Sequence, residues 1–184
     1  VTGLGIVSPI GNNVDEVLAS LKAGKSGIEA NADMAEHGFR SQIAGNVKLN
    51  VADHVDKRTL RFMGPGAAYS FIAMQQAIAD AGLEEGQVVN PMTGVIAGSG
   101  GPSTSAMFAA HNIVKDTGAT KRIGPFAVPK TMSSTVSANL ATAFKIKGMN
   151  FSITSACSTS LHCIGMAAQQ IALGTQDTMF AGGG

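Results

Sequence analysis

Hydrophobic residues along the chain follow two spacings, one typical of helices and the other typical of buried strands. Residues 14–21 carry apolar side chains at the first, fourth, fifth and eighth positions, which predicts a helix with one buried face. Asn12 or Asn13 would cap its start, and Gly24 would end it. A longer helix is predicted over residues 65–82, because proline favours the first helical position and glycine the position after the last.

Short apolar runs between the helical segments predict strands. They are VTGLGIVS at 1–8, QIAGNVKL at 42–49, TGVIAG at 93–98, MNFSIT at 149–154 and DTMFA at 177–181. Because strands that alternate with helices favour parallel pairing, the pattern predicts an α/β fold with a largely parallel sheet.

The second half of the chain adds two further helices. Residues 131–144 are mostly small, with apolar side chains about one helical turn apart, and residues 158–173 continue directly from a strand. Residues 102–130 are polar, and Pro125 and Pro129 fix the backbone there, so this region is expected to be rich in loops.

Composition narrows the class of protein. Hydrophobic residues make up 45% and charged residues 14%, yet no apolar run approaches the roughly 20 residues of a membrane helix. The surplus apolar surface is therefore expected inside the chain or against another protein. Thirteen basic and twelve acidic residues argue against nucleic acid as the main partner. Two cysteines cannot build a disulfide framework, which indicates a reducing compartment such as the cytoplasm.

The two ends suggest a fragment. The chain starts at Val1 without a methionine and stops at Gly184, directly after an apolar strand. No targeting segment is recognisable. We expect residues 1–184 to be part of a longer protein.

The glycine-rich stretch GLGIVSPIG does not match a dinucleotide-binding fingerprint. Five residues separate its second and third glycines, Pro9 lies within the turn, and no acidic residue closes a later strand where one is expected. Plain turn glycines are the better interpretation.

Cys157 lies where a strand meets a helix, in the sequence SACSTS. Free backbone N–H groups at a helix start favour the thiolate of a nearby cysteine, and they can also hold the oxyanion of an acyl-transfer intermediate. The small neighbours would let a bulky thioester approach. From the residues alone, a nucleophile and a buried cysteine acting as a small hydrophobe are about equally favoured.

Neither Cys163 nor any histidine is an obvious partner for this thiol. On a helix, Cys163 would lie about 120° and His162 about 140° away from Cys157, so Cys163 is expected in the core. The other histidines lie in polar segments without metal-ligand spacing: His37, His54 and His111. The sequence therefore contains no identifiable base, although an acylating thiol usually needs one.

VDKRTLRFM is the only basic cluster. If the segment is helical, Lys57, Arg58 and Arg61 share one face. Such a face is either a solvated edge or a docking patch for an acidic or phosphate-bearing partner.

Several stretches together resemble the β-ketoacyl-acyl-carrier-protein synthases, most closely type I of bacterial fatty acid synthesis. They are VTGLGIVSPIGN, DKRTLRFMG, GVIAGSGG, PKTMSSTVSANLATAFKIKG, SACSTS and QDTMFAGGG, in order across nearly the whole chain. The resemblance implies the N-terminal half of a thiolase-like fold, with a mostly parallel five-stranded sheet and helices on both faces. It also implies a homodimer.

The resemblance assigns roles to individual residues. Cys157 matches the nucleophile that accepts the acyl chain from the carrier protein's phosphopantetheine arm. Met132 matches a residue that lines the acyl pocket across the dimer interface, and Gly100 and Gly101 match small residues that keep this pocket open. The basic residues match the family's carrier-protein docking patch: Lys57, Arg58 and Arg61.

The implied reaction is acyl transfer to Cys157, followed by decarboxylative Claisen condensation with malonyl-carrier protein. It requires no metal or redox cofactor, because decarboxylation itself generates the carbanion. The family's two catalytic histidines, supporting lysine and gating phenylalanine lie in a second half that has no counterpart here. A non-catalytic module that binds carrier protein or a partner subunit is therefore the alternative. An enzyme acting on coenzyme A esters is disfavoured by the type I motifs.

Overall fold

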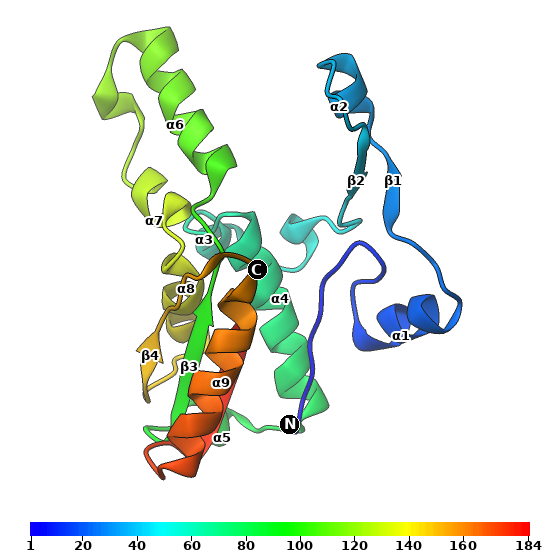
Figure 1. The fold of residues 1–184 in the computed structure, drawn as a ribbon. Coiled ribbons are helices and arrows are strands. Elements are labelled where there is room, and N and C mark those ends of the chain that lie inside the picture. Colours follow the sequence, from blue (N-terminus) through cyan, green and yellow to red (C-terminus); the bar gives the residue numbers. More distant parts are fainter.

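The computed structural model describes residues 1–184 and is built around one parallel sheet (Figure 1). The strands are β1 (Ile28–Ala30), β2 (Ile43–Gly45), β3 (Thr93–Gly98), β4 (Asn150–Phe151) and β5 (Thr178–Gly183). The helices are α1 (Val14–Lys22), α2 (Ala32–Glu36), α3 (Lys57–Leu60), α4 (Pro65–Asp80), α5 (Glu85–Val88), α6 (Thr104–Thr117), α7 (Ala127–Thr131), α8 (Thr135–Ala143) and α9 (Thr159–Ala172). Short 3₁₀ helices are η1 (Val51–Asp53), η2 (Thr120–Arg122) and η3 (Ala156–Ser158).

The parallel sheet has the strand order β4-β3-β5, with β3 in the centre. Helix α9 covers one face, where Ile96 packs with Cys163 and Ala167. Helices α4 and α8 cover the other face, where the neighbouring residues Val95 and Ala97 join the larger core cluster. Successive residues of a strand point to opposite faces, so β3 is buried along its whole length. The predicted parallel sheet with helices on both faces is confirmed.

The expected number of strands in that sheet was wrong. Three strands form the sheet, and β1 and β2 form a separate antiparallel hairpin. Residues 1–8 are not a strand, because side chains of α4 occupy their backbone amides. The amide of Leu4 donates to the Asp80 carboxylate at 2.8 Å, and that of Ile6 donates to Gln76 Oε1 at 3.0 Å.

The predicted helices at 14–21 and 65–82 are confirmed as α1 and α4. Asn13 caps α1 by accepting from the amide of Glu16, and a proline begins α4 after Gly64. The helix predicted over residues 131–144 begins later, because Met132 has an extended backbone and α8 starts at Thr135.

The region expected to be rich in loops contains helix α6. None of its residues is buried, although Ala106, Ala109, Ala110 and Ile113 have the i, i+3, i+4, i+7 spacing of a helix with one apolar face. The residues that cap α6 at its two ends also indicate a helix. The Ser103 hydroxyl accepts from the amide of Ala106, and Gly118 ends the helix in the left-handed conformation.

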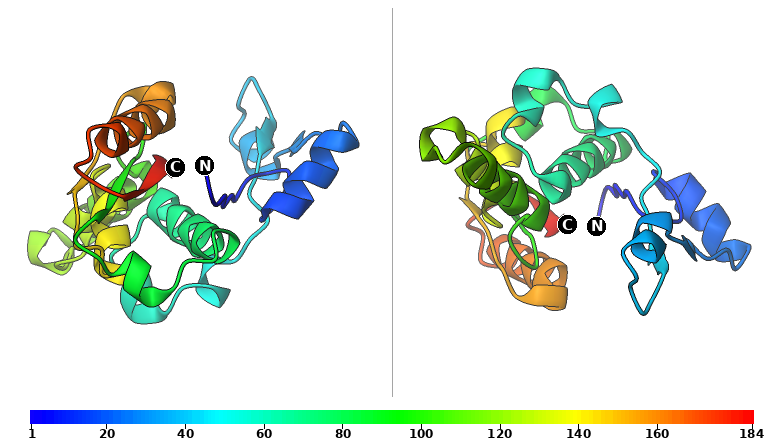
Figure 2. Two further views of the ribbon diagram at one scale, coloured as in Figure 1. Left: turned by 90° about the horizontal axis from the view of Figure 1, so that it is seen from below. Right: turned by 90° about the horizontal axis from the view of Figure 1, so that it is seen from above.

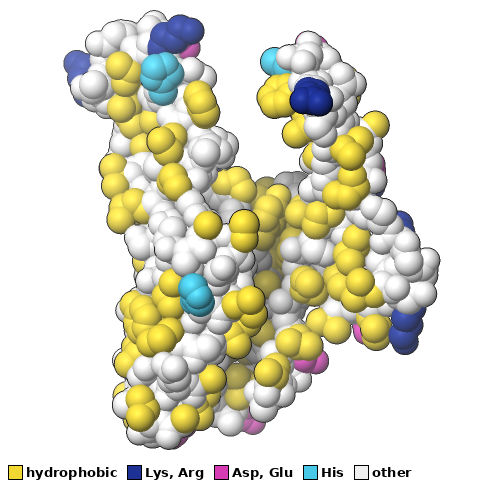
Figure 3. Space-filling model, viewed as in Figure 1, with side chains coloured by type: hydrophobic (Ala, Val, Ile, Leu, Met, Phe, Trp, Pro, Cys, Tyr) yellow, Lys and Arg dark blue, Asp and Glu magenta, His cyan; other side chains and the backbone are white.

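Two parts project from the α/β core: α6 with α7, and the β1–β2 hairpin with α1 and α2 (Figures 1 and 2). The space-filling view is hollowed between them, with hydrophobic side chains on both sides (Figure 3). Helix α9 also leaves large apolar side chains exposed: Leu161, Ile164 and Ile171. Part of the surplus apolar surface thus lies outside the core. None of the helices combines the length and the apolar character needed to cross a membrane.

Candidate active site

The turn between β4 and α9 presents Cys157 at the surface. The cysteine lies in the middle of η3, two residues before the first residue of α9, and its side chain is exposed. Ala156 has a φ of 50°, in the left-handed region that alanine adopts only at a cost of about 1–2 kcal/mol. A sharp, strained turn therefore carries the thiol, which agrees with the strand–turn–helix junction predicted from the sequence.

Side chains from the start of α9 fold back on this turn. The Thr159 hydroxyl accepts from the amide of Ser155 at 2.9 Å and donates to the carbonyl of Ala156 at 2.8 Å. The Ser155 hydroxyl lies 2.7 Å from Nδ1 of His162. Sequence reasoning missed this contact of Thr159, because the only sign of it is a hydroxyl side chain two residues after the cysteine.

Two glycines of the β3 region lie against the turn. A Cβ on Gly100 would come within 2.9 Å of the carbonyl oxygen of Ala156. A Cβ on Gly98 would meet the backbone of Ile153 and would lie 3.2 Å from the methyl group of Thr159. The loop after β3 and the cysteine turn therefore approach as closely as bare backbone allows.

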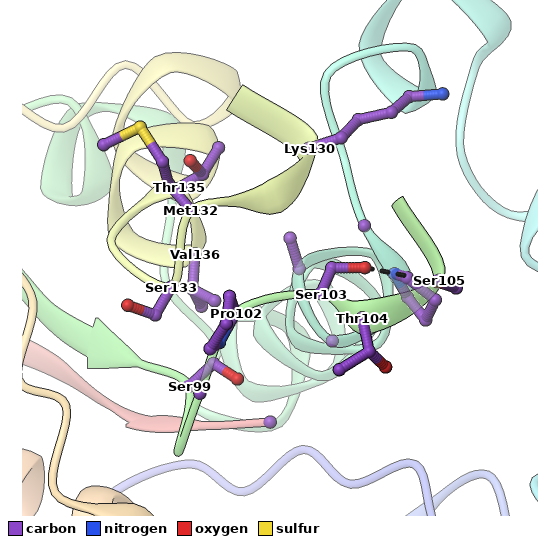
Figure 4. Close-up of a pocket in the computed structure, with 16 residues that line it drawn as sticks. Ser99, Pro102, Ser103, Thr104, Ser105, Lys130, Met132, Ser133, Thr135 and Val136 are labelled. Carbon is purple, nitrogen blue, oxygen red and sulfur yellow. Dashed lines mark hydrogen bonds between the residues drawn. The ribbon is translucent and has the colours of Figure 1, made fainter. Parts of the chain in front are cut away.

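Gly101 and Met132 line one pocket of about 250 Å³ (Figure 4). Small residues of the loop after β3 form one wall, and the start of α8 with the end of α7 forms another. Met132 is 50% exposed there. The structure thus brings these two predicted substrate-binding residues together, whereas Gly100 faces the cysteine turn and lies outside this pocket.

Serine and threonine hydroxyls tie the start of α8 to the segment that leads to Cys157. Thr154 Oγ1 donates to Ser133 Oγ at 3.0 Å. Ser152 Oγ lies 2.8 Å from Ser137 Oγ and donates to the carbonyl of Ala97 at 2.7 Å. Since Met132 precedes Ser133, these bonds link one wall of the pocket to the turn.

Cys163 is fully buried between α9 and the sheet, as predicted. Desolvation by this burial raises the pKa of its thiol above the ordinary value. No hydrogen bond joins Cys157 to a histidine. His162 is engaged with Ser155, and His37 contacts the carbonyl of Asp33. The structure therefore brings no base to the exposed thiol.

The basic cluster lies on α3 and just after it. Asp56 caps the helix by accepting from the Thr59 hydroxyl and from the amides of Thr59 and Arg58, and these hydrogen bonds lower the pKa of its carboxyl. Lys57 is exposed in the first turn. A capped α3 therefore holds the first two cations of the cluster at the surface.

Arg61 makes different contacts from the other two cations. Its guanidinium lies 5.0 Å from the ring centre of Phe62 and 4.9 Å from that of Phe126. The two rings meet edge to face with their centres 4.9 Å apart. Arg61 thus connects the basic cluster to the segment that begins α7, at whose other end Met132 lines the pocket.

A second pocket, of about 380 Å³ and lined mainly by apolar residues, lies between α6, α7 and the start of α4. Sequence reasoning missed it because residues 102–130 were expected to be loops. No group of three or more histidine, cysteine, aspartate or glutamate side chains is placed to hold a metal ion.

Comparison with known proteins gives a consistent match. The model of the β-ketoacyl synthase N-terminal domain matches residues 1–184. The 3-oxoacyl-[acyl-carrier-protein] synthase 1 of Haemophilus influenzae is 54% identical over all of this chain and 45% of its own length. The synthase of the same name from Escherichia coli K12 is 52% identical, over all of this chain and 46% of its own length. The chain thus spans about half the length of these curated relatives.

The fold has a match among solved structures as well. The crystal structure of a β-ketoacyl synthase from Burkholderia phymatum superposes with a TM-score of 0.80 at 25% identity. The superposition covers 96% of this chain and 44% of that one. The thiolase-like α/β fold implied by the sequence resemblance is thereby confirmed.

Proposed function

Because the chain belongs to the β-ketoacyl synthase family, we propose that residues 1–184 form the N-terminal, acyl-accepting half of a condensing enzyme of fatty acid synthesis. One observation carries the proposal: the exposed Cys157 lies at a strained turn that opens helix α9. A structural cysteine would be buried, as Cys163 is.

In the proposed first step, Cys157 Sγ attacks the carbonyl carbon of an acyl thioester carried by acyl carrier protein. The new S–C bond replaces the thioester bond, and the phosphopantetheine thiol leaves with the proton that the cysteine gave up. Backbone N–H groups at the turn would hold the oxyanion of the tetrahedral intermediate. The carrier protein is proposed from the names of the relatives and from the chemistry of the turn.

In the proposed second step, malonyl-carrier protein loses carbon dioxide and the resulting carbanion attacks the acyl group on Cys157. The new C–C bond forms the β-ketoacyl product, and the cysteine thiolate leaves. Decarboxylation supplies the electron pair, so the reaction needs no redox partner. The resemblance to the family implies that the histidines that assist this step belong to the other half of the enzyme.

We propose that the acyl chain lies near Gly100, Gly101 and Met132, beside the cysteine turn. The half-exposed Met132 and the edge strand β4 would face a second copy in a homodimer. Lys57, Arg58 and Arg61 would dock the acidic carrier protein, and the reaction would take place in the cytoplasm. Two exposed cations on a capped helix suit such electrostatic docking.

A non-catalytic module that binds carrier protein or a partner subunit is the second candidate. It is favoured by one observation: no histidine is hydrogen-bonded to Cys157. A module of this kind would bind carrier protein without accepting its acyl group.

Acylation by hexanoyl-carrier protein separates the two candidates. Intact-protein mass spectrometry should show one added hexanoyl group, and peptide mapping should place it on Cys157. The Cys163→Ala variant should still be acylated, whereas Cys157→Ala should not. Binding of the carrier protein without any acyl transfer would favour the module, and acylation that persists in Cys157→Ala would refute the assignment of the nucleophile.

A further inference from the structure

We infer that Thr159 is a positioning residue for Cys157, and that its hydroxyl holds the strained turn at Ala156 in the shape that presents the thiol. This inference rests on the proposed role of Cys157 as the acyl acceptor. It concerns a side chain that lies outside the substrate pocket.

The turn needs an outside constraint because its backbone is strained. Ala156 has a φ of 50°, and a non-glycine residue stays in this region only when surrounding contacts over-determine it. The 3₁₀ bond from the amide of Ser158 to the carbonyl of Ser155, at 3.1 Å, closes the turn on one side. The carbonyl of Ala156 accepts from the amide of Thr159, whereas the amide of Ser155 has no backbone partner.

The Thr159 hydroxyl gives the Ser155 amide its partner and adds a second hydrogen bond to the Ala156 carbonyl. The hydroxyl accepts a hydrogen bond from the Ser155 amide at 2.9 Å and donates one to the Ala156 carbonyl at 2.8 Å. A hydroxyl can do both at once because it carries one donor hydrogen and two lone pairs. The two bonded backbone groups bracket the strained residue, so together they fix its conformation.

These bonds are shielded from solvent and directed. Thr159 is 4% exposed, so water does not compete for its hydroxyl. Its methyl group faces Gly98 of β3, at 3.2 Å from where a Cβ on that glycine would lie. In the observed rotamer the hydroxyl faces the carbonyl of Ala156, three residues earlier, a bond that threonine side chains in helices can make.

Ordinary helix capping does not account for this arrangement. The residue before α9 is Ser158, and its side chain makes no capping bond. The Thr159 hydroxyl instead faces backwards, to groups that precede the helix. We therefore assign it to the turn rather than to the helix.

The test compares variants that separate the effect of the Thr159 hydroxyl from the effect of its branched shape. Thr159→Val keeps the branched shape and loses the hydroxyl, whereas Thr159→Ser keeps the hydroxyl. Thr93→Val is the matched control. Thr93 is also a buried threonine, at 3% exposure, and its hydroxyl donates to the Gln87 carbonyl at 2.6 Å, at the far end of β3 from the turn.

Two rates are measured at Cys157 in each variant of the chain. Acylation by the N-acetylcysteamine thioester of hexanoic acid requires the carbonyl oxygen to meet the turn's amides, and alkylation by iodoacetamide does not. In Thr159→Val we expect the ratio of acylation to alkylation to fall about tenfold, since the two lost bonds are each of ordinary strength. Thr159→Ser should stay near the wild-type ratio, and Thr93→Val should match it.

An unchanged ratio in Thr159→Val would overturn the inference, as would an equal fall in Thr93→Val. If the wild-type chain is not acylated at all, the proposed function fails, and hydrogen exchange of residues 155–158 then decides about Thr159. Faster exchange there in Thr159→Val alone would support its hold on the turn. Exchange unchanged from wild type would refute it.

Discussion

Gly100 lies so close to Ala156 that a Cβ on the glycine would come within 2.9 Å of the alanine's carbonyl oxygen. Contacts of this length between a Cβ and backbone essentially never occur, so the backbone would have to shift. The loop after the central strand can thus approach the turn that carries Cys157 only because Gly100 has no side chain.

The Gly100→Ala variant should therefore disturb the cysteine turn. We expect its free energy of unfolding to fall by about 1–3 kcal/mol, the usual cost of overpacking, and acylation of Cys157 to slow. Gly101→Ala is the matched control, because nothing lies within 4 Å of where its Cβ would be. Urea denaturation of both variants measures the difference. Equal stability of the two would contradict the close fit at Gly100.

The sequence was sufficient to predict the helix ends and the cysteine turn, because both depend on local signals. Asn13, Pro65 and Gly82 mark helix ends through backbone chemistry that acts within a few residues, and the structure has those ends. The cysteine turn was recognisable because a strand, a run of small residues and a helix follow each other directly.

Contacts between distant segments could not be predicted in the same way. Residues 1–8 have a strand-like pattern, but Asp80 and Gln76 of α4 occupy their amides, about 70 residues further along the chain. Helix α6 was missed because residues 102–130 are polar as a whole, although the apolar residues within it have helical spacing. The role of Thr159 depends on a left-handed alanine, which no side-chain pattern indicates.

Limited iodoacetamide near neutral pH should label Cys157 before Cys163. The first thiol is exposed at the turn, whereas the second is fully buried and its raised pKa keeps it protonated. Peptide mass spectrometry reports the site, and a repeat in urea should label both cysteines equally. Preferential labelling of Cys163 in the native protein would overturn the assignment of the nucleophile.

Stability should depend on the ionisation of Cys163 at alkaline pH. Burial raises the pKa of this thiol in the folded chain, so an unfolded chain releases the proton at lower pH than a folded one. The stabilising contribution is complete below the unfolded pKa, near pH 8.5, and is lost as the pH rises through the folded pKa. The free energy of unfolding should therefore fall over this range.

The pH dependence is best measured in variants that lack the Cys157 thiol. Urea denaturation of Cys157→Ser between pH 7 and pH 10 should show the decline, and Cys157→Ser with Cys163→Ala should show a smaller one. Groups common to both variants cancel in the difference. Parallel pH profiles would mean that Cys163 ionises as easily in the folded chain as in the unfolded chain.

Arg61 and Lys57 should differ in what their removal changes. Both are proposed to dock carrier protein, so Arg61→Ala and Lys57→Ala should each weaken its binding, with the loss reduced at high salt. Only Arg61 also lies over Phe62 and Phe126, at 5.0 and 4.9 Å. We expect Arg61→Ala to lower the melting temperature as well, and Lys57→Ala to leave it near wild type.

Binding by fluorescence anisotropy and melting by calorimetry give the two readouts. Glu36→Ala, at the end of α2, serves as a surface control of opposite charge. Unchanged carrier-protein binding in both cationic variants would remove the docking patch from the proposal, whatever happens to the melting temperature.

The chain on its own should complete the first step of the proposed reaction and not the second. Acyl transfer uses the exposed Cys157 thiol and the amides of its turn, and without a histidine base it should be slow but detectable. Decarboxylation of the malonyl group needs a base or donor beside the acyl-cysteine, and here no histidine bonds to Cys157 while His162 is held by Ser155 at 2.7 Å. Hexanoyl- and malonyl-carrier protein incubated with the chain should therefore yield acylated Cys157 without β-ketoacyl product by mass spectrometry. His162→Ala should leave that outcome unchanged, because this histidine is not assigned to the chemistry. Product formation that survives rigorous purification would show that residues 1–184 already contain the group that drives decarboxylation, and its loss in His162→Ala would identify that group.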